Sequence, residues 1–578
     1  MIMNKDILKK LIKSPALTDI WQWSASGHLS VFLLCVLNLL ITGCSLGVTV
    51  ATRGLIDGAA GHNREEIQIC AILLVILVLM MRGIAVMQGM LNTKTSALLL
   101  KDMRSLLLKR LMKKKYAGLN GLHSGELVNR MFSDVNVVKS GIMEIVPGLV
   151  SMGVSFIGAA VILIFMDWRF VVVLIVGGLL GLGLILVCNE PMKKRHKTMQ
   201  ESEGKLHAVL QETLENLRLI KASGSEARIE RRAGERQEAF VRAQLKKGYL
   251  VVGMNSGMNL AFQLSWLFCM LWGCRGIYRG ELTYGMLAAI IQLVGQIQGP
   301  IAGAAGIAAQ LYGTVSSAER LKEIMDLPEE DDEEAADGNE LYRNLAQIRM
   351  DDLTFSYGRE TENVLEKVNI CICPGDFVAV TGHSGSGKST LFQLLLGIYQ
   401  PCDGKLMFCF KDESGTLEAG DIEETQMPAS VCTRALFAYV PQGNTLFSGT
   451  LRENFAMFTD SASDEEIVQA ARTACIDQLI YELKDGLDTV IGERGIGLSE
   501  GQAQRVAVAR ALLSHAPILL LDESTSALDE ETEARLLENI SLLKNKTCLI
   551  VTHRKAALQI CDYRVHIDDG TAKLHNHP

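Results

Sequence analysis

Long apolar segments without charged residues dominate the first half of the chain. Five of them contain no Lys, Arg, Asp or Glu, namely residues 20–52, 145–166, 170–189, 248–274 and 282–318. A sixth, residues 67–93, contains only Arg82. A helix needs ~20 mainly apolar residues to cross ~30 Å of hydrocarbon, and within lipid it satisfies its own backbone polar groups. The pattern therefore predicts six membrane-spanning helices.

The connections between these segments differ in length and charge. With a cytosolic N-terminus, the inner connections are residues 94–144 and 190–247, which hold 24 Lys and Arg, whereas the three outer connections hold five. Basic residues accumulate on the cytosolic side of membrane proteins. We therefore predict a multi-pass protein of the plasma membrane with its N-terminus and its C-terminal half in the cytosol. We expect neither a cleaved signal peptide nor an N-terminal peptidase domain.

Both inner connections are long, polar and helical in pattern. We expect the spanning helices to continue into the cytosol and to turn back near Gly118–Gly125 and Ala222–Ser225, since twenty helical residues add ~30 Å. A basic surface held against anionic lipid is the alternative. Residues 1–27 are predicted to form an interfacial segment, with Trp21 and Trp23 at the level of the lipid headgroups.

Composition separates the chain into two halves. Of its 578 residues, 48% are apolar, which argues against disorder. Residues 1–325 hold 36 basic and 22 acidic residues, whereas residues 326–578 hold 21 basic and 43 acidic ones. Residues 326–340 contain nine acidic residues, and such a run is typical of a solvated linker. The linker would join a membrane domain, residues 28–325, to a second domain, residues 341–578.

The second domain begins with an apolar strand, a glycine-rich loop and a helix. Gly382-x4-Gly387-Lys388-Ser389 matches a phosphate-binding loop in this context. Its glycines let backbone N–H groups surround the phosphates, Lys388 can reach the β and γ phosphates, and the Ser389 hydroxyl can hold Mg²⁺. The loop residues that we expect around ATP are Gly382, His383, Ser384, Gly385, Ser386, Gly387, Lys388, Ser389 and Thr390.

A second apolar strand, residues 518–523, ends in two carboxylates. Ligands of open α/β sheets bind at the carboxyl ends of the strands. This rule places Asp522 beside the same Mg²⁺ as Ser389, and Glu523 where it can orient or deprotonate the attacking water. A solvated strand end is the alternative, and the pairing with Lys388 argues against it.

These motifs together resemble a half-transporter of the ATP-binding cassette (ABC) exporter family. The diagnostic segment is Leu498-Ser499-Glu500-Gly501-Gln502, which precedes the acidic strand and resembles the family signature LSGGQ. The resemblance implies an all-α membrane domain of six helices fused to a cytosolic α/β P-loop nucleotide-binding domain. It also implies ATP-driven export of amphipathic or hydrophobic molecules, such as drugs, lipids or peptides, by alternating access.

The resemblance implies further roles for single residues. Tyr357 matches the aromatic residue that stacks on adenine, and Gln442 matches the glutamine that touches Mg²⁺ and the attacking water. His553 matches the histidine that contacts the γ-phosphate, which makes it catalytic together with Glu523 and Gln442. Asp529 matches a loop at the dimer interface, and Glu493 a segment near the cytosolic helix tips.

The resemblance also implies a partner, because in this family the signature of one chain closes over the phosphate loop of another. Ser499, Glu500, Gly501 and Gln502 would then act in trans. We expect a homodimer, with a heterodimer of two half-transporters as the alternative, and neither nucleic acid nor zinc as a ligand. Segments near Ser124–Val138 and Gln211–Lys221 resemble the helices that couple the two domains in the family.

Two departures from the family pattern stand out. Glu500 replaces the first signature glycine, and its carboxylate repels ATP phosphates unless it points away or pairs with a cation. We expect activity to survive, because Ser499 and Gly501 are present. The second departure is Lys411–Thr433, which is longer than the usual strand connection and is expected to be a surface loop.

Polar residues inside the predicted spans are candidates for a substrate cavity. They are Arg82, Asn259, Gln263, Gln292 and Gln296. Charged residues inside a membrane are functional candidates by default, but polar residues also hold neighbouring helices together, and the sequence leaves both readings open. A membrane-anchored regulatory ATPase and an importer are the competing functions, and fused domains with six spans argue against most importers.

Overall fold

The computed structural model describes residues 15–122, 124–331, 337–358, 362–411, 426–443, 445–459, 461–492, 497–543 and 546–576. The chain folds into two compact units. The first comprises the chain up to Met112 together with Leu122–Asp326, and the second comprises Lys113–Gly121 and Leu327–Pro578. The short segment Lys113–Gly121, which the sequence analysis assigned to the membrane domain, therefore folds with the second unit.

The first unit is helical throughout its described residues. Its long helices are α3 (His28–Ala60), α4 (Arg64–Met112), α7 (Val135–Met166), α8 (Trp168–Glu215), α10 (Glu226–Tyr278) and α11 (Tyr284–Met325). Its short elements are α2 (Pro15–Trp23), η1 (Ala25–Gly27), α6 (Ser124–Asn129), the π-helical η2 (Arg130–Asp134) and α9 (Leu217–Ser223). Each predicted span has one long helix, and the first of these helices begins at His28.

Among the described residues, four of these helices are long and apolar enough to cross a membrane. They lie in Ala25–Ala60, Arg64–Met112, Ser124–Met166 and Glu226–Tyr278. The structure does not describe all side chains of α8 and α11. The spans expected in these two helices therefore stay predictions from the sequence. Helix α4 has 49 residues and α10 has 53, far more than the ~20 that a bilayer requires. Both helices are therefore longer than one crossing requires, and their continuation into the cytosol stays a prediction.

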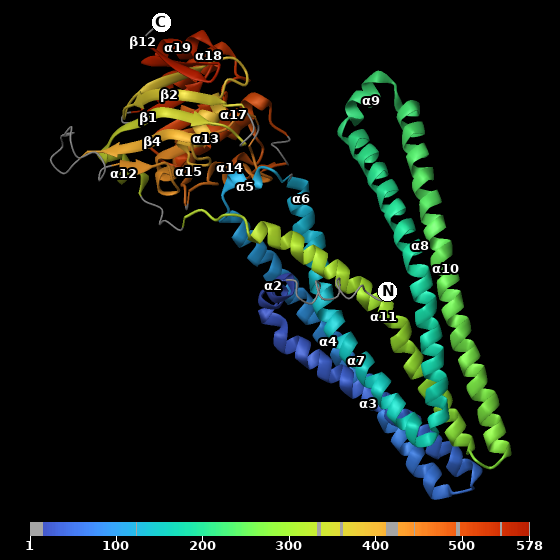
Figure 1. Cartoon of the computed structure of the whole chain (residues 1–578). Helices are drawn as coiled ribbons and strands as arrows, with labels where there is room; N and C mark the ends of the chain where they lie inside the picture. Colours follow the sequence, from blue (N-terminus) through green and yellow to red (C-terminus); the bar gives the residue numbers. More distant parts are fainter. Residues whose placement is uncertain are drawn as a thin grey trace. The chain divides into compact units, whose positions relative to one another are not determined.

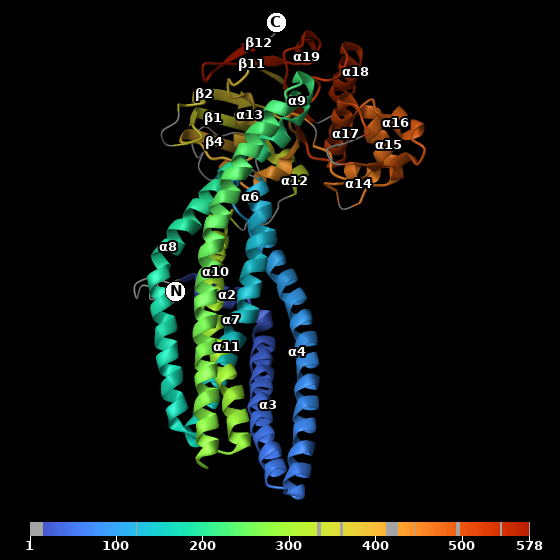
Figure 2. The same cartoon turned by 90° about the vertical axis from the view of Figure 1, so that its right-hand side faces the viewer.

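The helices of the first unit pack in two groups. Helix α3 packs against α4, α7 and α11, and α8 packs against α10. Figure 1 shows that the α8–α10 pair diverges from α7 and α11 toward α9, which joins the two helices at their tip. The turn after α9 uses Gly224 at a φ of 60°, a left-handed conformation that favours glycine. Figure 2 shows the same helices from the side.

Buried ion pairs fix the π-helical segment to α11. The Arg130 guanidinium donates to the Arg320 carbonyl at 2.6 Å and pairs with Glu126 and Glu323 at 2.6 and 2.9 Å. The Arg320 guanidinium in turn donates to Asp134 at 2.5 Å. Arg130 and Asp134 are both buried. These contacts hold η2 against α11.

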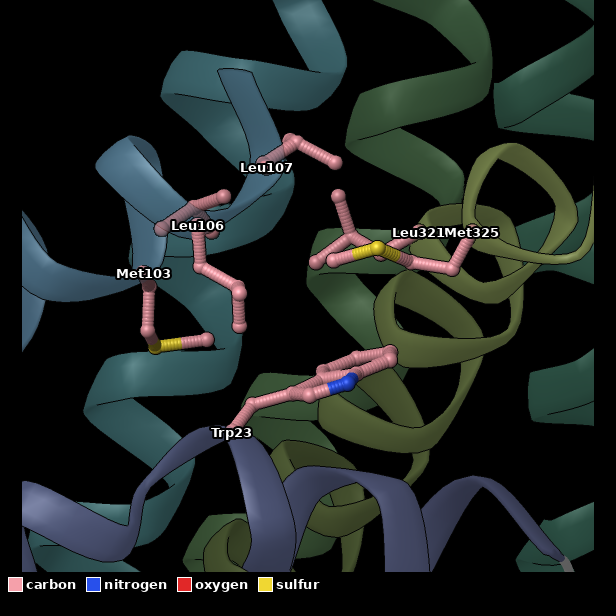
Figure 3. Close-up of a pocket in the computed structure, with 7 residues that line it drawn as sticks. Trp23, Met103, Leu106, Leu107, Leu321 and Met325 are labelled. Atoms are coloured by element: carbon pink, nitrogen blue, oxygen red, sulfur yellow. The ribbon is translucent and has the colours of Figure 1, made fainter. Parts of the chain in front are cut away.

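Helix α2 corresponds to the predicted interfacial segment, of which residues 1–14 lie outside the described residues. Trp21 is exposed and stacks on His28, with ring centroids 3.7 Å apart, as expected for a residue at headgroup level. Trp23 is half-buried. Figure 3 shows its indole closing a small apolar pocket between α2, α4 and α11, and the other lining residues are Met103, Leu106, Leu107, Val135, Leu321 and Met325.

The second unit is built on two main sheets. The antiparallel sheet has the order β2-β1-β4-β5 and the larger sheet has the order β12-β11-β3-β10-β9-β6. Strands β11, β3, β10, β9 and β6 run parallel, and β12 is antiparallel to β11. The strands are β1 (Leu345–Phe355), β2 (Leu365–Ile372), β3 (Phe377–Thr381), β4 (Asp403–Phe410), β5 (Gln426–Pro428), β6 (Phe437–Val440), β7 (Gly449–Thr450), β8 (Val490–Ile491), β9 (Ile518–Asp522), β10 (Thr547–Val551), β11 (Tyr563–Asp568) and β12 (Thr571–Asn576).

Helices cover the larger sheet and define two apolar cores, one on each side of it. Strands β3, β9 and β10 are fully buried, as expected for parallel strands covered on both faces. The helices are α5 (Tyr116–Leu119), α12 (Gly338–Asn344), α13 (Lys388–Leu395), α14 (Leu451–Phe455), α15 (Asp464–Thr473), α16 (Asp477–Glu482), α17 (Glu500–Leu513), α18 (Glu530–Ser541) and α19 (Lys555–Ile560), with 3₁₀ turns η3 (Cys432–Leu436) and η4 (Gly486–Asp488).

Part of the predicted acidic linker is not a free solvated chain. Glu329 forms a β-bridge with Lys114, and the Glu330 backbone N–H donates to the Lys113 carbonyl at 2.8 Å. Arg434 binds Glu330 through two hydrogen bonds of 2.6 and 2.8 Å. Glu329 and Glu330 are therefore paired with basic residues distant in sequence rather than left free to repel their neighbours. Residues 332–336 of the linker lie outside the described residues.

Candidate nucleotide site

The phosphate-binding loop connects β3 to α13. Gly382, Gly385 and Gly387 have φ angles of +151°, +84° and +100°, which favour glycine. A Cβ on Gly382 would also lie 2.2 Å from the Ile567 carbonyl of β11. The glycines predicted from the motif are thus required both by the turn and by the close approach of β11.

Lys388 closes this loop from its helical side. Its ammonium donates to the carbonyls of Gly382 and His383 at 2.9 and 2.8 Å, and its side chain is buried. The geometry places a fixed cation where the motif predicts phosphate binding.

Asp522 ends β9, two strands from β3 in the sheet, and is buried. The Tyr439 hydroxyl donates to its Oδ2 at 3.4 Å. Burial raises the pKa of Asp522, while a hydrogen bond with Ser389 and the charge of Lys388 act in the opposite direction. The structure thus brings together the serine and the aspartate predicted to hold Mg²⁺, from α13 and β9.

Glu523 follows Asp522 and contacts Gln442. The Gln442 Nε2 donates to the Glu523 Oε2 at 2.6 Å. Glu523 has a φ of +48°, which is uncommon outside glycine and is often found at functional sites. Gln442 follows β6, the parallel neighbour of β9, so adjacent strand ends carry both residues. Two residues expected to handle the attacking water therefore meet directly.

His553 follows β10, which lies between β3 and β9 in the sheet. Its side chain is exposed. Because β10 runs parallel to β3, His553 lies at the same sheet edge as the phosphate-binding loop. Its neighbour Arg554 donates to the carbonyls of Leu528 and Ser526 at 2.6 and 2.7 Å and to the buried Glu533 at 3.0 Å.

This Arg554–Glu533 pair was not foreseen from the sequence. The Thr525 hydroxyl donates to the other oxygen of Glu533 at 2.6 Å. The pair therefore joins the segment after β10 to the loop between β9 and α18. The available signal was an arginine directly after His553 and an acidic residue four positions after Asp529, but no local rule pairs the two.

Tyr357 lies beside the phosphate-binding helix. Its hydroxyl forms a hydrogen bond with the Thr390 hydroxyl at 2.9 Å. It also donates to the side-chain oxygen Oε1 of Gln393 at 3.1 Å. Its ring contacts Phe355 edge-on, with centroids 5.0 Å apart, and the residue is 48% exposed. A ring that is anchored at its hydroxyl and open on one side suits the expected stacking on adenine.

The signature forms the start of α17. Ser499 is its N-cap, and its hydroxyl accepts from the Gln502 N–H at 3.2 Å, while the Gln502 side chain accepts from the Ser499 N–H at 2.8 Å. Glu500 is exposed in the first helical turn, where negative charge is favourable. A Cβ on Gly501 would lie 2.9 Å from the Ala527 carbonyl. Among the described residues, no hydrogen bond or ion pair joins the signature to the phosphate-binding loop.

Asp529 caps the helix that follows β9. Its carboxylate accepts from the Thr532 N–H at 2.9 Å, and this backbone hydrogen bond lowers the pKa of Asp529. The side chain thus fixes the start of α18 within its own chain. Its expected place at a dimer interface stays a prediction.

Known families match both units of the chain. A model described as the ABC transporter transmembrane region matches residues 31–301, and one described as ABC transporter matches residues 365–526. An uncharacterized ABC transporter ATP-binding protein, YwjA of Bacillus subtilis, is 30% identical over 463 residues, or 80% of this chain and 78% of that protein. The chain belongs to the ABC transporter family.

Two further comparisons specify the type of ABC transporter. The ATP-dependent lipid A-core flippase of Syntrophus aciditrophicus is 27% identical over 98% of this chain and 90% of that protein. A solved structure of a bacterial Atm1-family ABC exporter with ATP bound has a TM-score of 0.79 at 23% identity and covers 96% of both chains. The predicted fold, a helical transmembrane domain fused to an ABC nucleotide-binding domain, is confirmed. So are ATP binding and ATP hydrolysis coupled to export.

The candidate cavity residues of this ABC exporter do not form one cluster. Arg82, Asn259, Gln263 and Gln292 are exposed and lie on α4, α10 and α11. Within the described part of the chain, no hydrogen bond or ion pair joins any two of the five candidates. Gln296 behaves differently, and its amide donates to the hydroxyls of Ser45 and Thr49 at 3.2 and 3.1 Å. Of the two roles considered for Gln296, this geometry favours a residue that holds α11 against α3 over one that contacts substrate.

Two further predictions concern Glu493 and the connection Lys411–Thr433. Residues 412–425 and Glu493 are outside the described residues. The rest of the Lys411–Thr433 connection is not only a loop, because β5 pairs with β4 through Phe408 and Met427.

Proposed function

We propose that this ABC exporter works as a homodimer that moves a lipid-like amphipathic molecule across the plasma membrane from the cytosolic side. The lipid A-core flippases among its relatives support this substrate class. The observation that carries the ATP-driven part is the contact of Gln442 with Glu523, directly beside the buried Asp522. Gln442 and Glu523 are the residues expected to handle the attacking water, so their contact supports ATP hydrolysis by this chain.

We assign each residue of the site one task. Lys388 binds the β and γ phosphates, and the backbone N–H groups of residues 382–389 surround them. Glu523 accepts the proton of the attacking water, and Gln442 orients that water. His553 contacts the γ-phosphate. Tyr357 stacks on adenine, which is worth roughly 1 kcal/mol beyond burial.

Mg²⁺ fits the residues present. Ser389 and Asp522 offer a hydroxyl and a carboxylate within hydrogen-bonding distance of each other, and oxygen is the ligand type that Mg²⁺ prefers. The Asp522 carboxylate is buried, and a buried charge is stabilised by a paired or coordinated cation. When bound, the ion neutralises charge on the phosphate oxygens. Gln442 would complete the set of protein ligands.

The dimer proposal rests on the signature and on α9. The signature residues have no contact with the loop of their own chain among the described residues, so we propose that they close over ATP on a partner. Leu214, Leu217 and Leu219 near α9 are exposed, and such apolar side chains in a cytosolic position suit a protein partner. Glu523 and His553 are both present, so two identical chains would form two complete sites.

Reconstitution tests this function. The full chain is placed in liposomes that carry a fluorescent phospholipid, and the fraction of the label accessible to dithionite is followed after addition of Mg-ATP. We expect ATP-dependent redistribution of the label that Glu523→Gln abolishes. Brisk hydrolysis with no redistribution of any lipid, drug or peptide tested would favour a regulatory ATPase instead.

A further inference from the structure

A short piece of the first cytosolic connection is built into the nucleotide-binding unit. Lys113–Gly121 belongs to this unit. The Lys114 side chain is 1% exposed, and its ammonium donates to the Leu327 carbonyl at 2.6 Å and to Glu329 at 3.0 Å. The Lys115 N–H donates to the Pro328 carbonyl at 2.9 Å. This piece, here called the docked segment, is therefore held by main-chain and buried side-chain contacts.

The docked segment contacts an aromatic residue of the apolar core. Tyr116, which begins α5 and is 51% exposed, meets Tyr399 edge-to-face at a centroid distance of 6.1 Å and an interplanar angle of 85°. Tyr399 is 7% exposed and belongs to the core cluster. Burial raises the pKa of Tyr399, and a hydrogen bond from Asn120 of the docked segment opposes this shift. Tyr399 is thus enclosed on one side by the docked segment.

Tyr399 also contacts the candidate nucleotide site. Its ring meets that of Tyr357 at 5.3 Å and 90°, and both rings also contact Phe355. Tyr357 is anchored to α13 by its hydroxyl. Three tyrosines from three distant parts of the sequence therefore form one continuous chain of edge-to-face contacts. It runs from the docked segment to the ring proposed to stack on adenine.

We propose that Tyr399 is a positioning residue that links docking of Lys113–Gly121 to adenine stacking on Tyr357. The proposal rests on the proposed role of Tyr357. Edge-to-face rings fix each other's orientation, so Tyr399 sets the plane of Tyr357 while the docked segment sets the plane of Tyr399. The coupling is reciprocal. If the docked segment increases the affinity for adenine by some factor, adenine increases the affinity of the docked segment by the same factor.

Two ligands separate positioning from general support of the fold. Binding of Mg-ATP and of Mg-tripolyphosphate, which has no base to stack, is measured for the full chain in nanodiscs. We expect Tyr399→Leu to weaken ATP about three- to ten-fold, in the range of one or two aromatic contacts, and to leave tripolyphosphate unchanged. Tyr399→Phe retains the ring and is expected to bind ATP within about two-fold of the parent protein. Equal loss of both ligands would mean a structural role only and would overturn the proposal.

The docked segment supplies a second readout, because Lys113, Lys114 and Lys115 are consecutive trypsin sites. We expect ATP to slow cleavage there in the parent protein and in Tyr399→Phe, as followed by mass spectrometry of the peptides. ATP should not slow this cleavage in Tyr399→Leu or in Tyr116→Ala. Tyr116→Ala removes a half-exposed ring and is expected to fold. ATP protection that is the same in all four proteins would overturn the proposal.

Tyr357→Ala distinguishes the two levels of the argument. If this variant binds ATP as the parent does, the adenine role of Tyr357 is wrong, and the link falls with it. If Tyr357→Ala loses affinity while Tyr399→Leu does not, the nucleotide site stands and only the link is wrong. If both lose ATP affinity and neither loses tripolyphosphate affinity, the chain of tyrosines acts as proposed.

Discussion

The amide of Gln442 lies 2.6 Å from the carboxylate of Glu523. The two residues are far apart in the sequence, and the parallel pairing of β6 with β9 brings them together. Glu523 also adopts a left-handed backbone conformation. A polar contact at a strained position is typical of catalytic groups, and it gives the first prediction a defined geometry.

Glu523→Gln is expected to bind ATP normally and to lose hydrolysis. The amide keeps the size of the side chain but cannot accept the proton of the attacking water, and a general base contributes about 10²- to 10⁴-fold. Phosphate release by the purified full chain in lipid measures the rate, and a fluorescent ATP analogue measures affinity. A variant that hydrolyses ATP at the parent rate would show that another group is the base.

Lys388→Ala is expected to weaken ATP binding by an order of magnitude or more, since a buried cation within hydrogen-bonding distance of a phosphate contributes about 1.5–3 kcal/mol. The ammonium also ties the carbonyls of Gly382 and His383, so the empty loop should become more mobile. Equilibrium binding of a labelled nucleotide checks the first effect, and hydrogen exchange over residues 382–389 checks the second. Unchanged affinity would contradict the assigned role.

Two neighbouring signature positions should respond in opposite ways. Glu500→Gly removes an exposed carboxylate that faces no partner within the described residues, so we expect the ATPase rate to stay within about three-fold or to rise, because repulsion of a phosphate is relieved. Gly501→Ala forces a Cβ to within 2.9 Å of the Ala527 carbonyl and should lower the rate. The ATPase assay compares both variants, and a severe loss in Glu500→Gly would mean that the carboxylate is used.

Glu533→Ala should destabilise the nucleotide-binding unit by about 3 kcal/mol, because it leaves Arg554 without its buried partner. Glu538→Ala changes an exposed residue on the same helix and is the matched control, with an expected effect below about 0.5 kcal/mol. Thermal unfolding of the full chain, followed by fluorescence, compares the two. Equal transition temperatures would show that the Arg554–Glu533 pair is not important for stability.

Local motifs account for the parts that were predicted correctly. The residues from Gly382 to Ser389 adjoin one another in sequence, and a parallel sheet brings its strand ends to one edge whatever the connections between them. The phosphate-binding loop, Asp522 and Glu523 could therefore be placed without tertiary information, whereas Gln442 was predicted only from the resemblance to the ABC family. The charge-free segments similarly predicted helices, because length and hydropathy are local properties.

Features that depend on distant partners were missed. The acidic stretch around Glu329 and Glu330 appeared solvated because its partners, Lys114 and Arg434, are remote in sequence. The docked segment was assigned to the membrane domain for the same reason. The packing of Trp23 was also missed, since its neighbours on α4 and α11 form a pocket for it. No sequence pattern within one segment encodes such a contact.

Complementation between two inactive variants tests most directly whether ATP is hydrolysed between two copies of the chain. One copy carries Lys388→Ala and the other carries Gly501→Asp, and mixed dimers are isolated through two different tags. Action of the signature in trans leaves one complete site, so the mixed dimers should hydrolyse ATP well above either variant alone. Activity no higher than that of the two variants measured separately would contradict a shared site.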